Sequence, residues 1–380
     1  MAGFLFLLSE ESTASGAFEA GVYSTKVKPP AGHWLSFHEA TLADFLSMRE
    51  GDFVFFFQKR KIYGVGRLVS VAGSCVYLNF PSASDPTIER PHSANDVLFS
   101  WTDLEEAGHH RWLCTFEGAP GLLPNPVDMD DALSSRPQAF RSLRVIEKRS
   151  FVKMDDEENR ALLDILARRN STAMKVIPAQ SATPHGHRRV LKHVTPAHRI
   201  SAGPVVSVVR EADGSVKHEM ALEAALVEAL TREETRAAKV FGKWSYISHQ
   251  VAASPFKPVL YMDRIDVFGY RRSPPFDSIT DYLVVEVKRD AAMLEDVAQL
   301  MKYVDWIAQQ HTGGDYSMIH AFLVAFDFEI SSRKAFDLTV GRGFTVGTRP
   351  TRSETWNDLK LVKYTTVKSA SPLAFEIHAL

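Results

Sequence analysis

The feature that most constrains the fold is an apolar run that ends in charged residues. The segment reads Tyr282-Leu283-Val284-Val285-Glu286-Val287-Lys288. A run of branched apolar residues without polar alternation is typical of a strand buried on both faces. Such a strand needs helices on both sides of a mixed or parallel sheet. We therefore predict an α/β (α+β) unit built around residues 282–287.

The residues from 219 onward predict the order α-β-β-α. Apolar residues recur at helical spacing at Leu222, Leu226 and Leu230, so a helix is expected over 219–235. Further elements are expected as strands at 259–268 and 282–287, a helix at 291–309 and a third apolar strand at 320–328. The tail is expected to be β-rich, with strands at 336–340, 344–348 and 359–366.

Residues 1–169 are predicted to form a separate, β-rich domain, because 380 residues exceed one typical hydrophobic core. A hairpin is expected from 51–58, which rises out of a turn into a strand, and 61–69, joined by the basic turn Lys59-Arg60-Lys61. The other expected elements are strands at 4–8, 74–80, 111–117 and 143–146 and a helix at 156–169.

Residues 170–210 differ in composition from both flanks. They contain no Asp or Glu, several Arg, Lys and His residues, and four prolines. We expect an interdomain linker here, followed by a domain over 211–380. Two interpretations stay open: a solvated connector, or a basic strap that contacts phosphates.

Overall charge and cysteine content narrow the cellular setting. The chain has 44 Lys and Arg against 46 Asp and Glu, so its net charge of −2 gives no global signal for nucleic acid. Cys75 and Cys114 fit neither a disulfide framework nor a cysteine-based zinc site, which favours a cytoplasmic location. The apolar stretch at 4–8 is too short for a signal peptide, and no segment predicts a membrane span.

Three charged residues at the ends of two neighbouring predicted strands are the main candidates for catalytic residues. Alternate residues of a strand point to the same face, so Glu286 and Lys288 project together. Asp266 lies late in the preceding strand and is expected to reach the same place. Val287 points the other way and offers its carbonyl as a further metal ligand.

This set of groups suits phosphodiester hydrolysis. Carboxylate oxygens hold Mg²⁺, which Mn²⁺ can replace, while several waters stay on the ion. The metal lowers the pKa of a bound water and stabilises charge on the phosphoryl oxygens. Lys288 can orient the attacking water or neutralise developing negative charge.

The two helices are expected to complete the site. Glu223, at the margin of the apolar face of the first helix, is the predicted third carboxylate, with Glu228 as the competing candidate on a more polar side. Gln299 and Tyr303 are four residues apart and share one face of the second helix. We expect nucleic-acid contacts from two further cations beside the carboxylates, Arg264 and Arg289.

The region from Ala221 to Ala308 resembles the nuclease domain of NucS-type mismatch endonucleases and, more broadly, RecB-like members of the PD-(D/E)XK superfamily. The matching stretches are Leu222-Glu223, Arg264-Ile265-Asp266, Glu286-Val287-Lys288-Arg289 and Gln299-x-x-x-Tyr303. The resemblance implies that Glu223, Asp266 and Glu286 bind metal, that Lys288 is catalytic, and that Gln299 and Tyr303 lie beside the active site. Residues 1–150 do not resemble the DNA-binding domain of that family, so mismatch recognition is not implied.

The N-terminal region resembles the PUA-like superfamily of β-barrels, which includes EVE and YTH domains. The resemblance rests on the stretches at 48–56 and 63–68. Domains of this class commonly hold a modified base in an aromatic cage. Four aromatic residues could supply such walls, although a core position is the commoner fate of each: Tyr23, Trp34, Phe37 and Trp101.

Together these features predict a metal-dependent endonuclease with an N-terminal reader, suited to restriction of modified or foreign DNA. One alternative keeps the nuclease but gives the N-terminal domain a nucleotide or protein ligand. Another is a non-catalytic DNA-binding protein with a degenerate nuclease fold. The sequence leaves open RNA as the substrate, and a homodimer in which two sites cut two strands.

Overall fold

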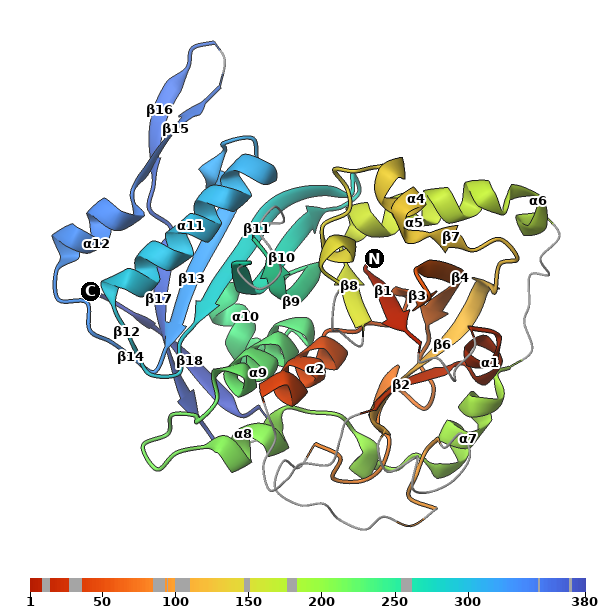
Figure 1. The fold of residues 1–380 in the computed structure, drawn as a ribbon. Helices are drawn as coiled ribbons and strands as arrows, with labels where there is room; N and C mark the ends of the chain where they lie inside the picture. Colours follow the sequence, from red (N-terminus) through yellow and green to blue (C-terminus); the bar gives the residue numbers. More distant parts are fainter. Residues whose placement is uncertain are drawn as a thin grey trace. The chain divides into compact units, whose positions relative to one another are not determined.

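The computed structural model describes residues 1–8, 14–26, 36–84, 93, 95–99, 110–146, 151–175, 183–253, 262–347, 349–368 and 371–380. The chain forms two compact units (Figure 1). The first contains Met1–His38 and Asp44–Ile200, and the second contains Glu39–Ala43 and Ser201–Leu380. None of the helices within the described ranges is both long and apolar enough to cross a lipid bilayer.

The first unit is built on a curved sheet with the strand order β2-β6-β4-β3-β1-β8, to which β5 adds by pairing with β6 and β7 by pairing with β4. The strands are β1 (Gly3–Leu7), β2 (Val22–Lys26), β3 (Phe53–Gln58), β4 (Lys61–Leu68), β5 (Val76–Leu78), β6 (His110–Gly121), β7 (Val127–Asp128) and β8 (Phe151–Met154). Its core is aromatic: Phe6 packs against both Phe56 and Phe151, and Phe56 packs against Phe116.

Helices cover this sheet and connect its strands. They are α1 (Ala14–Ala20), α2 (Ser36–Leu46, with residues in both units), α4 (Met129–Ser135), α5 (Asp156–Arg169), α6 (Ser171–Met174) and α7 (His185–His193), with the 3-10 turns η1 (Ser142–Val145) and η2 (Pro196–His198). The longest, α5, buries Leu162 and Leu166 in one cluster with Phe55 and Phe140. Asp155 caps α5 by accepting the N–H groups of Glu157 and Glu158.

Most expected elements of the first unit are present, including the hairpin β3–β4 and the helix at 156–169. The strand expected at 143–146 is wrong, because this segment forms η1. The physical reason is Glu158, whose buried Oε1 accepts the backbone N–H groups of Arg141, Ser142 and Leu143 at 2.7, 2.7 and 3.3 Å. Three consecutive N–H groups converging on one oxygen are incompatible with the alternating pattern of a strand ladder.

Residues 183–210, expected to be part of an irregular linker, contain the helices α7 and α8 (Gly203–Val209) and the turn η2. Two histidines of this segment are buried. The Nε2 of His187 lies 2.9 Å from the carbonyl oxygens of both Gly21 and Phe116, and the Nε2 of His198 lies 2.8 Å from that of Asp96. These bonds to backbone carbonyls give the segment a fixed path.

The second unit contains a six-stranded mixed sheet with the order β18-β17-β13-β11-β10-β9. Its strands are β9 (Tyr246–Ala252), β10 (Arg264–Ser273), β11 (Ser278–Val287), β13 (Ile319–Ala325), β17 (Leu359–Thr366) and β18 (Leu373–His378). The three central strands β11, β13 and β17 are parallel, and the remaining pairings are antiparallel. The predicted mixed α/β fold, with a curved N-terminal sheet and a mixed C-terminal sheet, is confirmed.

Helices pack on this sheet: α9 (Glu219–Thr231) contacts β9, β10 and β11, whereas α11 (Leu294–Gln310) contacts β11 and β13. The smaller elements are α10 (Thr235–Phe241), β12 (Ala291–Ala292), η4 (Tyr316–Met318), β14 (Asp327–Phe328), α12 (Arg333–Val340), β15 (Arg342–Val346) and β16 (Arg352–Trp356). The pair β15–β16 forms a two-stranded ribbon apart from the main sheet (Figure 1).

Three expectations for the second unit need correction. The strand expected at 336–340 is the helix α12, where Phe336 and Val340 are buried at i, i+4 spacing and Ser332 caps the first turn through the N–H of Ala335. The helix expected over 291–309 begins three residues later, because 291–292 pair with β14. The strand expected at 259–268 is β10, which begins at Arg264 and continues to Ser273, so Asp266 lies near its start and not late in it as expected. Residues 259–261 lie outside the described residues.

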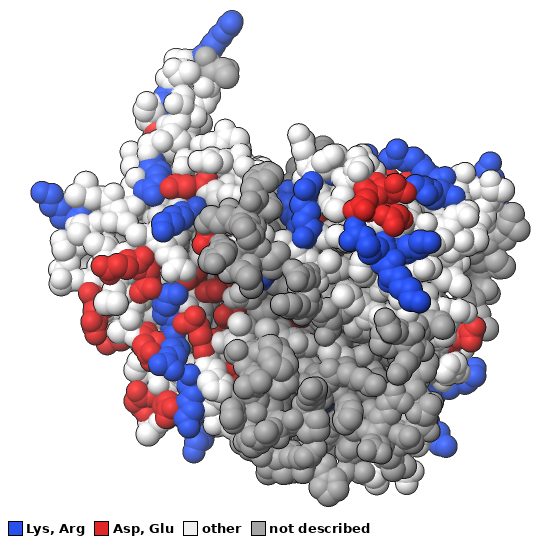
Figure 2. Space-filling model, viewed as in Figure 1, with Lys and Arg blue, Asp and Glu red and all other residues white. Residues whose placement is uncertain are grey.

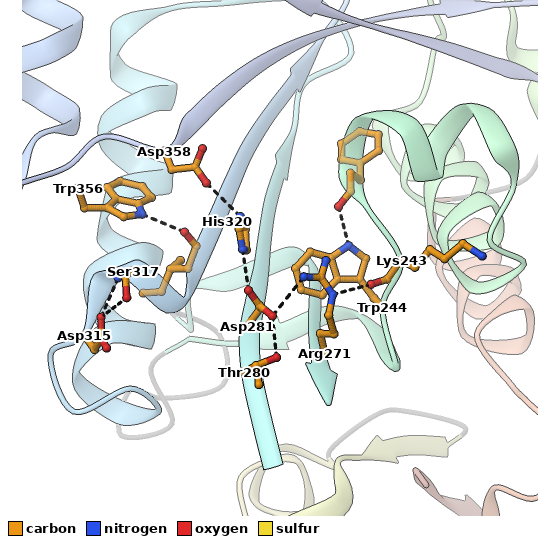
Figure 3. A network of polar contacts seen from close by, with 12 residues as sticks. Lys243, Trp244, Arg271, Thr280, Asp281, Asp315, Ser317, His320, Trp356 and Asp358 are labelled. Carbon is orange, nitrogen blue, oxygen red and sulfur yellow. Dashed lines mark hydrogen bonds and ion pairs between the residues drawn. The ribbon is translucent and has the colours of Figure 1, made fainter. Parts of the chain in front are cut away.

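A polar network ties β10, β11 and β13 together (Figure 3), and its members Arg271 and Asp281 each lie five residues along their strand from Asp266 and Glu286. His320 on β13 contacts two carboxylates, with Nε2 3.0 Å from Asp281 and Nδ1 3.0 Å from Asp358. Asp281 also accepts a bond from Arg271, whose guanidinium lies 4.6 Å from the ring centroid of Trp244. These side-chain contacts therefore link β10, β11 and β13 in addition to their backbone hydrogen bonds.

Candidate active site

The pairing of two antiparallel strands sets the geometry of the site. Val267 on β10 pairs with Val285 on β11, so the register places Asp266 directly opposite Glu286. Opposite residues of an antiparallel pair share one face of the sheet. Both carboxylates are nearly inaccessible to solvent, with exposures of 8% for Asp266 and 1% for Glu286. The Oδ2 of Asp266 also accepts the backbone N–H of Val287 at 2.8 Å.

A glutamine from the neighbouring strand β9 joins a helix carboxylate to this pair. The side-chain amide of Gln250 donates to Glu223 at 2.9 Å and to Asp266 at 3.0 Å. Gln250 has a positive φ of 52°, which is uncommon for a residue other than glycine. Residues on either side of it pair regularly with β10, so the unusual conformation is confined to the position that faces Asp266. Glu223 is itself 2% exposed.

Lys288 and two residues of α11 surround Glu286. The Nζ of Lys288 lies 2.8 Å from Oε1 of Glu286, and the same oxygen accepts the side-chain amide of Gln299 at 2.8 Å. That amide also donates to the hydroxyl of Tyr303 at 3.1 Å. The spacing of Gln299 and Tyr303 on one helical face therefore brings both beside Glu286. The structure thus gathers Glu223, Asp266, Glu286, Lys288, Gln299 and Tyr303.

Burial dominates the electrostatics of this cluster. It raises the pKa of Glu286 to about 8, and the charge of Asp266 adds to the rise. Burial likewise raises the pKa of Glu223 well above its usual range, with a further contribution from Asp266. Burial acts to lower the pKa of Lys288, but the charge of Glu286 outweighs it and raises the pKa overall. The site thus concentrates acidic groups that favour a nearby cation.

The two expected arginines lie at the edges of the cluster. Arg264 is the first residue of β10 and is partly exposed. Arg289 follows Lys288 and is half exposed. Its guanidinium bonds Asp290 and the carbonyl of Lys217, and its backbone N–H donates to Glu219 at 3.2 Å.

Glu228, the competing carboxylate on α9, has a different environment. It is 2% exposed, so its expected position on a more polar side of the helix is wrong. Its Oε2 accepts the backbone N–H of Ala202 at 2.7 Å, and its Oε1 lies 2.5 Å from Arg232. Glu228 therefore anchors the start of α8, while Glu223 faces the acidic cluster.

The donor set has the chemistry that Mg²⁺ prefers, because it consists of carboxylate oxygens. The Oε2 of Glu286 is buried and has no hydrogen-bond partner among the described residues. Within the same residues, no three His, Cys, Asp or Glu side chains stand in a ready-made coordination cluster. The carboxylates are instead bonded by the side-chain amides of Gln250 and Gln299 and by the ammonium group of Lys288.

Of the four aromatic side chains expected to form a base cage in the first unit, the structure describes only that of Tyr23. Trp34 and Trp101 lie outside the described residues, and so does the side chain of Phe37. Tyr23 is buried in the core, where one face of its ring stacks on Phe6 with 4.0 Å between centroids. Burial raises the pKa of its hydroxyl. Tyr23 is a core residue in this structure, not a wall open to a base.

Sequence reasoning missed Gln250 and its neighbour His249, whose Nε2 lies 3.8 Å from Glu223. The strand β9 that carries them was not predicted at all. A usable signal was present, because the segment from Tyr246 begins with aromatic and β-branched residues, which favour strands.

No family model matches the chain. No curated protein matches it either. Among solved structures, it is similar to a protein of Pseudomonas syringae (19% identity, 43% of this chain, 99% of that chain, TM-score 0.28). It is also similar to EndoMS in a complex with double-stranded DNA (27% identity, 20% of this chain, 27% of that chain, TM-score 0.15). A third match is a repair endonuclease from Pyrococcus abyssi (23% identity, 30% of this chain, 41% of that chain, TM-score 0.20). The chain thus spans less than half of either endonuclease.

Proposed function

We propose that this protein is a divalent-metal-dependent nuclease that hydrolyses phosphodiester bonds in DNA. The observation that carries the proposal is the register of β10 and β11, which sets Asp266 opposite Glu286 while Lys288 bonds Glu286 at 2.8 Å. Adjacent buried carboxylates with a lysine in contact are the groups that metal-assisted hydrolysis of a phosphodiester requires.

In this proposal Glu223, Asp266 and Glu286 hold Mg²⁺ or Mn²⁺. The bound ion supplies a water of lowered pKa and stabilises negative charge on the phosphoryl oxygens. Lys288 orients the attacking water or neutralises the charge that develops on the phosphate. Gln299 and Tyr303 keep Glu286 in place through the bonds described above. In the proposal both also contact a substrate phosphate.

The biological role we propose is restriction or defence, in which the N-terminal unit selects modified or foreign DNA. What supports it is the presence of a separate curved-sheet unit in the same chain as the candidate nuclease. The presence of two units in one chain does not identify the substrate, which experiment has to determine.

The test is cleavage of a panel of plasmid DNAs, modified and unmodified, together with RNA, in Mg²⁺ or Mn²⁺. We expect wild type to cut DNA and both Asp266→Ala and Lys288→Ala to lose cleavage. Asp290→Ala is the matched control, because Asp290 follows the same strand but is largely exposed and pairs only with Arg289 among the described residues. Each variant should remain folded under the assay conditions, which its urea unfolding curve checks.

Two results would contradict the proposal. If Asp266→Ala cut as fast as wild type, the acidic cluster would not be the active site. If wild type cut neither DNA nor RNA and calorimetry detected no binding of Mg²⁺ or Mn²⁺, the fold would serve binding without catalysis.

A further inference from the structure

The ribbon β15–β16 leaves the second unit as an arm, defined here as residues 342–356 (Figure 1). Its strands pair from Arg342 with Trp356 to Val346 with Arg352, and residues 347–351 connect them, of which 348 lies outside the described residues. The strands are paired only with each other, within the part of the chain that the structure describes. Five residues at about 3.3 Å each give the arm a reach of roughly 16 Å before its turn.

The root of the arm is firmly attached. The guanidinium of Arg342 makes a two-pronged ion pair with Asp305, with distances of 2.8 and 3.1 Å. The indole of Trp356 donates to the carbonyl of Ile319 at 2.9 Å, and its ring lies beside that of Tyr316. An isolated two-stranded ribbon is only marginally stable in water, so these contacts explain how the arm persists.

The outer part of the arm is exposed and polar. Arg349 in the turn and Arg352 at the start of β16 are both exposed, and neither side chain bonds another described residue. Figure 2 shows Lys or Arg side chains at the far end of the projecting arm. The exposed residues with hydroxyl groups are Thr345, Thr351, Ser353 and Thr355. Glu354 is the single acidic residue of the arm.

We propose that the arm binds a DNA duplex by entering its major groove, with Arg349 and Arg352 contacting phosphates or base edges. This inference rests on the proposed function, since it names how the substrate is held. The major groove admits a two-stranded β-ribbon, and arginine is the side chain best suited to phosphate and guanine. Hydroxyl groups add hydrogen bonds to the phosphate backbone.

The arm is also connected to the candidate active site through a single helix. Asp305, which holds Arg342, lies on α11, and the same helix carries Gln299, which bonds Glu286. A duplex gripped by the arm is therefore held at a fixed distance from the carboxylates. This link explains why a nuclease would keep an otherwise costly exposed ribbon.

A second copy of the chain fits the arm less well than DNA does. Stable protein interfaces have an apolar centre. Between the root residues, the only large apolar side chains of the arm are Phe344 and Val346, and both are partly buried already. Among the exposed side chains, two arginines outnumber the single acidic residue Glu354 and four carry hydroxyl groups, which complements a polyanion.

The test measures binding apart from cleavage. A fluorescent 30-base-pair duplex is titrated, without Mg²⁺, into Asp266→Ala protein carrying either R349A/R352A or the control pair R236A/K239A. The control removes two exposed cations of the same unit from α10. We expect the arm pair to weaken binding roughly tenfold and to reduce the salt dependence by about 1 per cation. R349K/R352K should retain most of the affinity.

Several outcomes would overturn the inference. Equal losses for the arm and control pairs would indicate general charge attraction, and no loss for the arm pair would remove the arm from DNA binding. If R349A/R352A changed the oligomeric state without DNA, the arm would be a contact between copies. Wild-type cleavage with an unaffected arm variant would leave the proposed function standing, whereas a chain that neither binds nor cuts any duplex would remove both.

Discussion

Gln250 donates one side-chain amide to Asp266 at 3.0 Å while its backbone has a φ of 52°. The same amide reaches Glu223, so a single residue in an uncommon conformation joins two buried carboxylates that would otherwise repel each other. Uncommon backbone conformations persist where the surroundings over-determine them, and they gather at functional sites.

Replacing this residue tests its role as a positioning group. Gln250→Ala keeps the β-carbon, so the cost of the positive φ stays, but both bonds to carboxylates are lost. In EDTA the free energy of unfolding should fall by about 1–3 kcal/mol, because two buried acceptors lose a donor. Saturating Mg²⁺ should recover most of this difference, since a bound cation also neutralises the carboxylates. Urea unfolding with and without Mg²⁺ measures both free energies of unfolding.

Gln309→Ala, a substitution at an exposed position of α11, is the control and should alter neither free energy of unfolding. A loss that Mg²⁺ leaves unchanged would make Gln250 purely structural.

Replacement of the two buried glutamates of α9 should affect cleavage differently. Glu223→Gln should reduce cleavage by about a thousandfold, because several kcal/mol of charge stabilisation are lost with a metal ligand. The same change should raise the urea midpoint in EDTA, since it removes a charge that burial and Asp266 disfavour.

Glu228→Gln, in contrast, should leave the cleavage rate per folded molecule near wild type, because Glu228 pairs with Arg232 and accepts the N–H of Ala202 instead of facing the acidic cluster. Similar activity losses for both variants would contradict the division of roles within α9.

Lys288 is predicted to act on charge without holding the metal. Lys288→Met should lower the cleavage rate about 10²–10³-fold, which is typical for the loss of one group that stabilises transition-state charge. Calorimetry should show Mn²⁺ binding retained, because the carboxylates remain. Lys302→Met, a change at an exposed lysine on α11, serves as the control. Abolished Mn²⁺ binding in Lys288→Met would assign Lys288 to the assembly of the site and not to the reaction.

His320 should make stability depend on pH. Its pKa is raised, chiefly by the hydrogen bond to Asp358 and also by Asp281, even though burial acts in the opposite direction. The folded state therefore binds the proton more tightly than the unfolded state. The stabilisation is complete below the unfolded pKa of about 6.5 and is lost as the pH rises through the raised folded value. The difference in urea midpoint between wild type and His320→Gln should shrink across that window. A difference that stays constant with pH would mean that the imidazole is held as a neutral hydrogen-bonding group.

The charged residues of the candidate site were predictable because their evidence is local. Glu286 and Lys288 are two residues apart in an apolar strand, so their shared face follows from strand geometry. Gln299 and Tyr303 follow from helical spacing in the same way. Gln250 was not predictable by this route, since its role depends on a pairing with β10 and on a backbone conformation that no spacing reports.

The errors in secondary structure have a similar origin. The segment at 336–340 is short and apolar, and such runs favour a strand. A helix N-cap just before the run is the signal that favours a helix instead. Ser332, four residues before Phe336, is that cap. The turn at 142–145 depends on Glu158, which follows it by more than a dozen residues, and no local pattern indicates that contact.

The bond between the N–H of Val287 and Asp266 has an evolutionary consequence. A peptide group is present whichever amino acid occupies the position, so drift at 287 can change the side chain without disturbing the hold on the carboxylate. Only proline, which lacks the hydrogen, would break it. The side chain of Val287 is fully buried, so packing restricts this position to apolar residues. An alignment of descendants would therefore show an apolar column and attribute it to the core, although the peptide N–H at the same position also holds Asp266.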